Sequence, residues 1–436
     1  MKSAETIFAL SSGRLPCGVA VIRVSGGLTR SILEKSLGFA PEPRVMRYAP
    51  FRNANGDILD RCLNVFFPGP DNFTGEDSAE FHLHGSIAVV RAVSAFLESF
   101  DGVRHGLPGE FAKRAFLNGK LDLAEAEGLG DLIAAETESQ LRLAHLQADG
   151  TLSSIYGEWR GELVQCRAMI EAAIDFSDED DVASSAMSGV LAKAHALSIT
   201  METCLGRSAG AEIIRDGLRV VILGAPNAGK SSLLNALAGR DVAIATEEAG
   251  TTRDLIDLRL DLGGSLAIFT DTAGIRDGAG IVESIGIERA LGRAANADVV
   301  LLLEDLSNPI KLDVETSAPH ILRVGNKMDL LDSVSGNYDY SISAQSGAGL
   351  EALLDGIRSI AESFSKNGEI LVVQQRQKAL IASCLRELDF VKGSVSDLEI
   401  AAEHLRRATD CIGQLTGDVD VEELLEVIFS RFCIGK

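Results

Sequence analysis

The segment from Gly224 to Ser231 restricts the fold of this 436-residue chain more than any other feature. It reads Gly-Ala-Pro-Asn-Ala-Gly-Lys-Ser, follows the apolar, β-branched run 218–223 and precedes the helical run 232–237. Glycines at both ends let backbone N–H groups point at a phosphate, and the N-terminus of the following helix adds a positive dipole end. This order predicts a doubly wound α/β domain in which Lys230 reaches the β- and γ-phosphates and the Ser231 hydroxyl binds Mg²⁺.

Two further motifs follow in the order expected of a GTP-binding domain. Asp-Thr-Ala-Gly at 271–274 ends an apolar run, where the Asp can hold the metal and the glycine N–H can contact the γ-phosphate. Asn-Lys-Met-Asp at 326–329 follows another, and its carboxylate can accept the two N–H groups of guanine that adenine lacks. The set predicts a GTPase. Its nucleotide-binding residues are Asn227, Ala228, Gly229, Lys230, Ser231, Ser232, Thr252, Asp271, Thr272, Ala273, Gly274, Asn326, Lys327, Asp329, Ser343 and Ala344.

The segment 249–254, Ala-Gly-Thr-Thr-Arg-Asp, is typical of a loop that orders around a γ-phosphate, and Thr252 is placed to complete the Mg²⁺ shell. Hydrolysis also needs a group that orients the attacking water. This is commonly a Gln directly after the Asp-x-x-Gly motif, but that position is Ile275. Another residue must therefore orient the water. Asn227 is a candidate ligand for a monovalent cation, and the alternative is that it only caps the phosphate loop.

Proline content and periodicity divide the rest of the chain. Seven of the ten prolines lie in the first 108 residues, among short β-like runs at 18–24 and 63–67 and a helical stretch at 87–99, which predicts a mixed α+β domain. Helical periodicity predicts three long helices over about 121–209 and returns after about residue 370. We expect an α/β domain inserted into a helical domain, with an independent C-terminal bundle as the alternative. The predicted domains are 1–120, 121–215 (first helical part), 216–366 (GTPase) and 367–436 (second helical part).

Composition limits the partners and the compartment. The formal charge is −22, but residues 1–120 are net +2, with 14 basic against 12 acidic side chains. Because Lys and Arg supply most affinity for phosphate backbones, a nucleic acid would approach this N-terminal third or a local patch elsewhere. No apolar run approaches the roughly 18 residues of a membrane helix. The seven scattered cysteines, and Glu5 where a signal peptide needs a basic flank and a long apolar segment, predict a cytoplasmic protein.

Several segments together resemble one family. They are the phosphate loop, the Gly-Thr-Thr-Arg-Asp segment, Asp-Thr-Ala-Gly-Ile-Arg at 271–276, Glu-Ser-Ile-Gly-Ile-Glu-Arg at 283–289 and the C-terminal Phe-Cys-Ile-Gly-Lys at 432–436. The stretch from Pro108 to Asp122 belongs to the same set. In these segments the chain is similar to the bacterial tRNA modification GTPases of the MnmE (TrmE) family, and the resemblance covers essentially its whole length.

The resemblance implies a fold and a reaction. The N-terminal domain would bind 5-formyl- or 5,10-methylene-tetrahydrofolate and mediate homodimerisation, and a Ras-like GTPase domain would be inserted between two helical segments. With a flavin- and NADH-dependent partner, MnmG (GidA), the family forms a heterotetramer that adds a carboxymethylaminomethyl or aminomethyl group at C5 of the wobble uridine, position 34, of certain tRNAs. Potassium- and GTP-dependent pairing of the two GTPase domains would stimulate hydrolysis.

The resemblance also implies functional residues. It assigns water orientation to Glu283, GTP and K⁺ contacts to Thr246, further K⁺ contacts to Asn227, Glu248 and Thr251, and folate contacts to Arg23, Glu80, Lys120 and Lys436. A competing interpretation is a GTP-dependent ribosome-assembly or RNA-binding switch without one-carbon chemistry. Such proteins usually carry a basic RNA-binding module after the GTPase domain, whereas residues 218–436 here are net −12 and end in helices.

Overall fold

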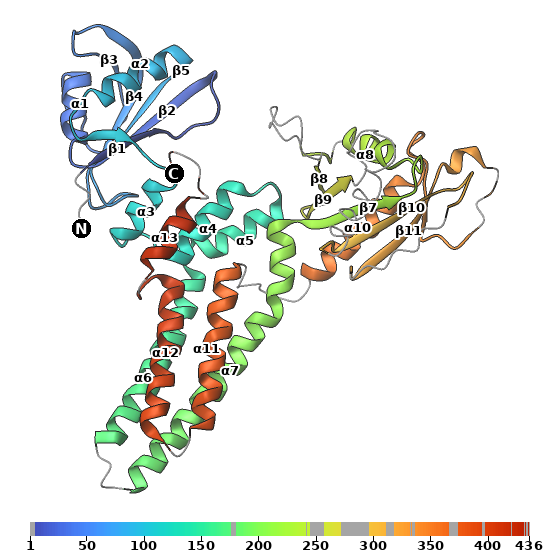
Figure 1. The fold of residues 1–436 in the computed structure, drawn as a ribbon. Helices are drawn as coiled ribbons and strands as arrows, with labels where there is room; N and C mark the ends of the chain where they lie inside the picture. Colours follow the sequence, from blue (N-terminus) through green and yellow to red (C-terminus); the bar gives the residue numbers. More distant parts are fainter. Residues whose placement is uncertain are drawn as a thin grey trace, which may run out of the picture. The chain divides into compact units, whose positions relative to one another are not determined.

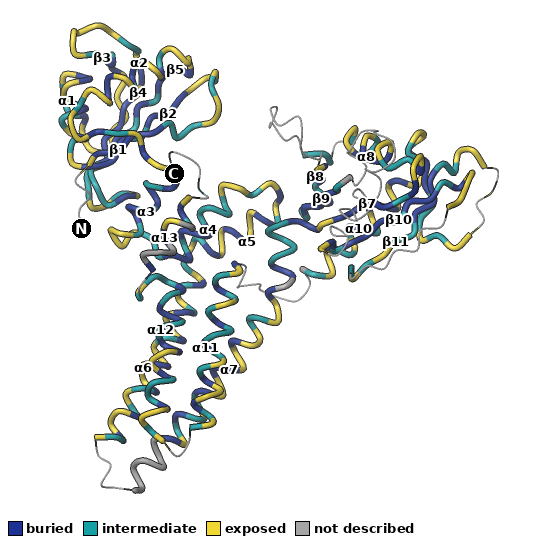
Figure 2. The backbone as a smooth tube through the Cα atoms, viewed as in Figure 1, coloured by how far each residue is buried: buried dark blue, intermediate teal, exposed yellow. Residues whose placement is uncertain are grey.

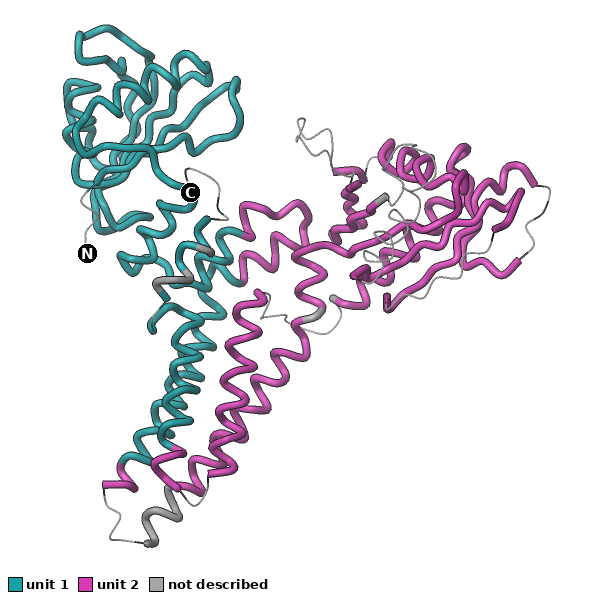
Figure 3. Tube along the Cα trace, viewed as in Figure 1, with its two compact units in different colours: residues 1–130, 147–171, 402–436 teal, residues 131–146, 172–401 magenta. Residues whose placement is uncertain are grey.

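The computed structural model describes residues 5–175, 180–240, 242–244, 257–271, 296–310, 318–331, 333, 336–365, 374–394, 397–419, 421–430, 432 and 435. The chain divides into two compact units, coloured separately in Figure 3. Unit 1 comprises residues 1–130, 147–171 and 402–436, and unit 2 comprises residues 131–146 and 172–401. This division groups segments by packing, so the domain boundaries at residues 120, 215 and 366 stay predictions.

A six-stranded sheet forms the N-terminal part of unit 1 (Figure 1). Its strands are β1 (Thr6–Leu10), β2 (Cys17–Ser25), β3 (Arg47–Arg52), β4 (Ile58–Phe67), β5 (Ser78–Gly85) and β6 (Val103–His105), in the order β3-β4-β5-β2-β1-β6. Side chains alternate along β2, so that Ala20, Ile22 and Val24 are buried on one face. Buried residues of α1 (Thr29–Leu37) and α2 (Ile87–Glu98) join the same core.

The opposite face of this sheet carries α3 (Glu110–Leu117), because Phe111 packs against Ile7 and Ala9. Gly109, directly before α3, has φ 67°. A Cβ atom there would overlap the backbone of Phe429 at the end of α13 (Glu422–Phe429), so this close approach requires glycine.

The C-terminal end of the chain returns to the same sheet. The Ser11 hydroxyl donates a hydrogen bond to the carbonyl oxygen of Gly435 at 3.0 Å, although the two residues are 424 positions apart in the sequence. Gly435 has φ 94°, and a Cβ atom there would overlap the carbonyl oxygen of Leu10. Gly435 therefore lies beside the β1–β2 connection within unit 1.

Among the described residues of the first helical stretch there are four helices, so the expectation of three is wrong. They are α4 (Leu123–Ala134), α5 (Glu138–Ala148), α6 (Thr151–Asp175) and α7 (Asp180–Asp216). The extra break comes from a capping box at the start of α5. The Gln140 side-chain oxygen accepts hydrogen bonds from the backbone N–H groups of Glu136 and Thr137, at 2.8 and 3.0 Å.

Helices follow in the C-terminal part of the chain, where helical periodicity returns after about residue 370. They are α11 (Gln375–Gly393), α12 (Leu398–Thr416) and α13. Within unit 2, α11 packs along α7, which precedes the α/β domain in the sequence (Figure 1). The helical domain is thus formed by segments from both flanks, and the fold class predicted from the sequence is confirmed.

The α/β domain of unit 2 is built on a six-stranded sheet in the order β12-β11-β10-β7-β9-β8, parallel except for the β8–β9 pair. Its elements are β7 (Leu218–Gly224), α8 (Lys230–Ala238), β8 (Asp257–Asp261), β9 (Leu266–Asp271), β10 (Val299–Asp305), β11 (His320–Asn326), the short helix η1 (Met328–Leu330), β12 (Tyr340–Ser341) and α10 (Leu350–Ser365). Buried residues of α8 and α10 pack on one sheet face. Figure 2 shows that β7 and β10 are buried along most of their length, as expected of central parallel strands.

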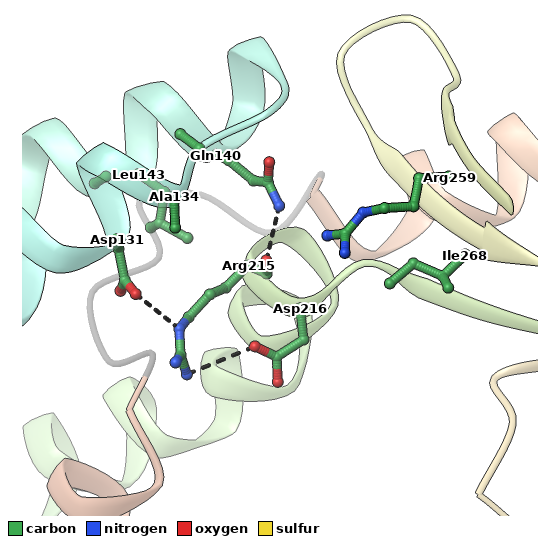
Figure 4. Close-up of a pocket in the computed structure, with 10 residues that line it drawn as sticks. Asp131, Ala134, Gln140, Leu143, Arg215, Asp216, Arg259 and Ile268 are labelled. Atoms are coloured by element: carbon green, nitrogen blue, oxygen red, sulfur yellow. Dashed lines mark hydrogen bonds and ion pairs between the residues drawn. The ribbon is translucent and has the colours of Figure 1, made fainter. Parts of the chain in front are cut away.

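The α4–α5 connection supports this domain at the β8–β9 hairpin. Glu136 pairs with Arg259 at 2.8 Å, and the Ser139 N–H donates to the carbonyl oxygen of Gly264 at 3.2 Å. Beside these contacts lies a cavity of about 330 Å³ (Figure 4). In its wall Arg215, at the end of α7, pairs with Asp131 at 3.1 Å. The hairpin is thereby anchored to the helices of its own unit.

Candidate functional site

The phosphate loop connects β7 to α8 in a conformation that its sequence requires. Gly229 precedes α8 with φ 98°, and Asn227 has φ 64°. Gly224 packs against β10, where a Cβ atom would lie 2.5 Å from the carbonyl oxygen of Leu303. The Lys230 ammonium donates to the carbonyl oxygens of Gly224 at 2.9 Å and Ala225 at 3.1 Å. These bonds hold the lysine head inside the mouth of the loop, beside the N-terminus of α8.

Asn326 joins three of the predicted motifs. Its side chain is 1% exposed at the end of β11. The amide nitrogen donates to the carbonyl oxygen of Ala228 in the phosphate loop at 2.9 Å, and the amide oxygen accepts the N–H of Ala344 at 3.0 Å. A Cβ atom on Gly229 would collide with this amide, which gives a second reason for glycine there. One buried amide thus brings together the phosphate loop, the Asn-Lys-Met-Asp segment and the Ser343–Ala344 turn.

The residues that face the expected base differ in their surroundings. Asp329 lies exposed in η1, and Ser343 is fully buried, where its hydroxyl accepts the N–H of Ser346 at 3.0 Å. The Lys327 ammonium contacts the carboxylate of Asp305 at 2.5 Å. Asp329 is therefore accessible to a ligand, whereas Ser343 shapes the turn from inside.

Two carboxylates at the end of β10 were missed by the sequence reasoning. Glu304 is 5% exposed and accepts hydrogen bonds from the Tyr338 hydroxyl at 2.9 Å and from Arg323 at 3.2 Å. Burial and the neighbouring Glu304 carboxylate raise the pKa of the Tyr338 hydroxyl. Asp305 is the register partner of Asn326 on the adjacent strand. A polar residue at the end of an apolar parallel strand was the signal that could have identified Asp305.

Several predicted residues lie outside the described residues. They are Thr246, Glu248, Thr251, Thr252, Thr272, Ala273, Gly274, Glu283 and Lys436. Asp271 is the last residue of β9, next to Ile222 of β7, but its side chain is not described. Asn227 is the one predicted K⁺ ligand within the described residues, and it is exposed. The cation role and the capping role of Asn227 both stay predictions.

A second polar cluster lies on the N-terminal sheet, on the face that carries α3. Arg23 and Glu80 are register partners on β2 and β5, and their side chains pair at 2.9 Å. His82 contacts the other oxygen of Glu80 at 3.2 Å. The Arg23 guanidinium also lies 5.7 Å from the ring centre of Phe73 and 5.9 Å from that of Phe111. A cation, a carboxylate and an aromatic ring are thus available on one face.

The loop beside this cluster brings in Lys120. The Asn118 amide donates to the carbonyl oxygen of Thr74 at 2.7 Å. A Cβ atom on Gly75 would lie 3.4 Å from Cε of Lys120, so the exposed Lys120 lies against the same loop. Three of the four predicted folate contacts, Arg23, Glu80 and Lys120, are therefore on the described surface of unit 1.

Comparisons with known proteins cover both units. Residues 123–433 match the family model described as the MnmE helical domain, and residues 6–120 match that of the GTP-binding protein TrmE N-terminus. The chain is 52% identical over 436 residues to the tRNA modification GTPase MnmE of Brucella melitensis biotype 1, covering 99% of this chain and 98% of the relative. The protein of the same name from Brucella anthropi is 50% identical over 434 residues, with the same coverage.

Among solved structures, the chain is similar to the G domain of the T. maritima FeoB iron transporter. The identity is 23%, the match covers 34% of this chain and 99% of that chain, and the TM-score is 0.26. Within the described part of the chain, no helix combines the length and the apolar character needed to cross a membrane.

Glu110, at the start of α3, is the centre of an ion-pair network on the N-terminal domain. It pairs with Arg104 at 2.7 Å and with Arg114 at 3.1 Å, and it accepts the N–H of Leu107 at 2.9 Å. Arg114, only 3% exposed, also pairs with Glu76 at 2.9 Å. Burial alone would raise the pKa of the Glu110 carboxyl, but these hydrogen bonds lower it from 4.5 to about 2.

This network makes the stability of the N-terminal domain pH-dependent. Because the folded-state pKa of Glu110 is depressed, its contribution is complete above 4.5 and is lost as the pH falls towards 2. At neutral pH, Glu110→Gln should lower the free energy of unfolding by roughly 1–2 kcal/mol, and this difference should shrink with acidification. Hydrogen exchange of the backbone amides of β1 and β6 measures this difference in the free energy of unfolding at each pH. Glu34→Gln, on the exposed side of α1, is the control, and a difference independent of pH would contradict the assignment.

Proposed function

The chain belongs to the MnmE family of tRNA modification GTPases, and from this premise we propose that it modifies C5 of the wobble uridine in certain tRNAs. The product would carry a carboxymethylaminomethyl or aminomethyl group. The observation that carries the proposal is that one chain combines a guanine-nucleotide site around Asn326 with an Arg23–Glu80 cluster on the N-terminal sheet. A GTPase that acts only as a switch has no need of the second site.

The Arg23–Glu80 cluster fits a folate in its chemistry. A pterin ring offers N–H groups that a carboxylate such as Glu80 can accept, and its flat face can stack on Phe73, which is 37% exposed. Arg23 and Lys120 are cations that can meet the folate carbonyls or its glutamate tail. Lys436, at the chain end, is proposed as a further contact. When bound, the folate would supply the one-carbon unit for the modification.

In the GTPase domain, the residues around the phosphate loop would have separate roles in binding and hydrolysing GTP. Lys230 would exchange its two carbonyl partners for the β- and γ-phosphate oxygens, while the N-terminus of α8 faces the same charge. Ser231, exposed in the first turn of α8, fits an oxygen ligand for Mg²⁺, with Thr252 as the second protein ligand. Asp329 would select guanine, and Glu283 would orient the attacking water.

K⁺ is proposed as a further cofactor that supports transition-state charge. Asn227 would supply a side-chain oxygen, with Thr246, Glu248 and Thr251 as further ligands. Asn227 is exposed in the phosphate loop, which is compatible with this role. K⁺- and GTP-dependent pairing of two GTPase domains within a homodimer would then stimulate hydrolysis.

The proposed complex includes a second protein. The net charge of −22 makes this chain poorly suited to hold tRNA alone, because its acidic surface repels the phosphate backbone. We therefore propose that a flavin- and NADH-dependent partner, MnmG, supplies much of the phosphate contact in a cytoplasmic heterotetramer. The direct affinity for tRNA should accordingly be modest and strongly dependent on salt.

The potassium role predicts a salt-specific rate. GTP hydrolysis should rise at least severalfold when K⁺ replaces Na⁺ at equal ionic strength, because K⁺ is the proposed cofactor. Asn227→Ala should remove that difference. Asn235→Ala, on the exposed side of α8 outside the loop, should retain it. Phosphate release assays measure both, and equal rates of the unaltered protein in the two salts would rule out the potassium role.

The folate role predicts binding without GTP. Purified protein should bind 5-formyltetrahydrofolate in isothermal titration, and Arg23→Ala should weaken this binding by about tenfold or more, since it removes a charged partner of the ligand. Arg30→Ala is the matched control, because Arg30 lies over Phe66 from α1 on the other side of the sheet. If the unaltered protein does not bind 5-formyltetrahydrofolate, the competing interpretation is favoured instead: a GTP-dependent switch without one-carbon chemistry.

A further inference from the structure

Asp305 is the last residue of β10 and lies directly beside Asn326. The two oxygens of its carboxylate have different partners. One oxygen contacts the Lys327 ammonium at 2.5 Å. The other accepts hydrogen bonds from the backbone N–H of Ser307 at 2.9 Å and from its hydroxyl at 2.6 Å. The carboxylate therefore links the turn after β10 to the residue that follows Asn326.

The Asp305 end of this link is rigid. Asp305 is held in the β10–β11 ladder, and the N–H of the next residue, Leu306, donates to the carbonyl oxygen of Asn326 at 2.9 Å. The N–H of Asn308 closes the turn by donating to the carbonyl oxygen of Asp305 at 3.1 Å. The side chain of Asp305 is 16% exposed. Its carboxylate consequently has a fixed position relative to Asn326.

Lys327 lies at the other end of this link. Its backbone is left-handed, with φ 67°, and its side chain is one-third exposed. A lysine side chain has four rotatable bonds, and an unrestrained ammonium would occupy many rotamers. The contact with Asp305 restrains this freedom by holding the ammonium at the end of β10, and Lys327 itself is one residue after Asn326 and two residues before Asp329 in the sequence.

The charge state of Asp305 is consistent with a permanent link. Burial alone would raise the pKa of the Asp305 carboxyl, but the hydrogen bonds from Lys327 and Ser307 lower it below the usual value. The carboxylate is thus ionised throughout the neutral range, and the link does not depend on pH there.

We propose that Asp305 is a positioning residue for nucleotide binding: it holds the Lys327 stem against the face of the purine, while Asp329 reads the guanine edge. Asp305 itself does not touch the nucleotide. A stem that packs on the face of a base does not distinguish one purine from another, whereas an edge-reading carboxylate does. Asp305 should therefore set affinity without setting base preference. The inference builds on GTP binding by the domain.

The test is a comparison of fluorescent GTP and ITP analogues on the full chain, since inosine lacks the 2-amino group of guanine. Asp305→Asn should raise the dissociation constants of both by about three- to tenfold, mainly through faster release, and leave their ratio unchanged. Asp329→Asn should change the ratio. Asp355→Asn is the control, because Asp355 is an exposed carboxylate that pairs with Arg358 at 2.6 Å on α10.

A double-mutant cycle separates positioning from a general structural effect. In a Lys327→Met background, Asp305→Asn should cause no further loss of affinity, because the ammonium that it holds is gone. An equal loss in both backgrounds, or unchanged affinity in Asp305→Asn alone, overturns the proposal. If Asp305→Asn does not fold, Asp305→Glu keeps the charge but displaces it by one methylene, and the same cycle applies. Failure of the unaltered protein to bind GTP would instead contradict the nucleotide site itself.

Discussion

The double hydrogen bond of the Asn326 amide is the interaction on which the nucleotide site depends. Its nitrogen fixes the phosphate loop at Ala228, and its oxygen fixes the turn at Ala344. The amide is buried, so breaking either bond would leave a polar group without water, at a cost of about 1–3 kcal/mol. Asn326 is also the last residue of β11, so the end of this strand sets the positions of Lys327 and Asp329. Phosphate recognition and base recognition therefore share one rigid anchor.

The N-terminal domain is held together differently on its polar face. Its polar face is organised by ion pairs rather than by a single amide: Arg23 with Glu80, and the buried Arg114 with Glu76 and Glu110. Removing one partner of such a pair leaves the other charge desolvated, which is costly. The end of the chain returns to the same domain at Gly435. In unit 1, Gly435 thus packs beside residues that follow the first strand of the sheet.

The sequence predicted most where local chemistry and long-range packing agree. The glycines of the phosphate loop and the apolar runs of β7 and β11 specify their own conformation, so the loop and its neighbours could be located in advance. The break between α4 and α5 was missed although Thr137 and Gln140 form a recognisable capping box. Asp305 was missed because its role comes from strand register, which sequence spacing alone does not supply. The segments around Glu283 stay predictions.

The central claim is that guanine-nucleotide binding and the Arg23–Glu80 cluster serve one tRNA modification. Nucleoside analysis of tRNA from a strain that lacks this gene, complemented with the unaltered chain, Asn326→Ala or Arg23→Ala, tests it most directly. The account predicts that the unaltered chain restores the modified wobble uridine and that neither variant does so fully when expressed at equal levels. Full restoration by Arg23→Ala, or unmodified wobble uridine with the unaltered chain, would contradict the account.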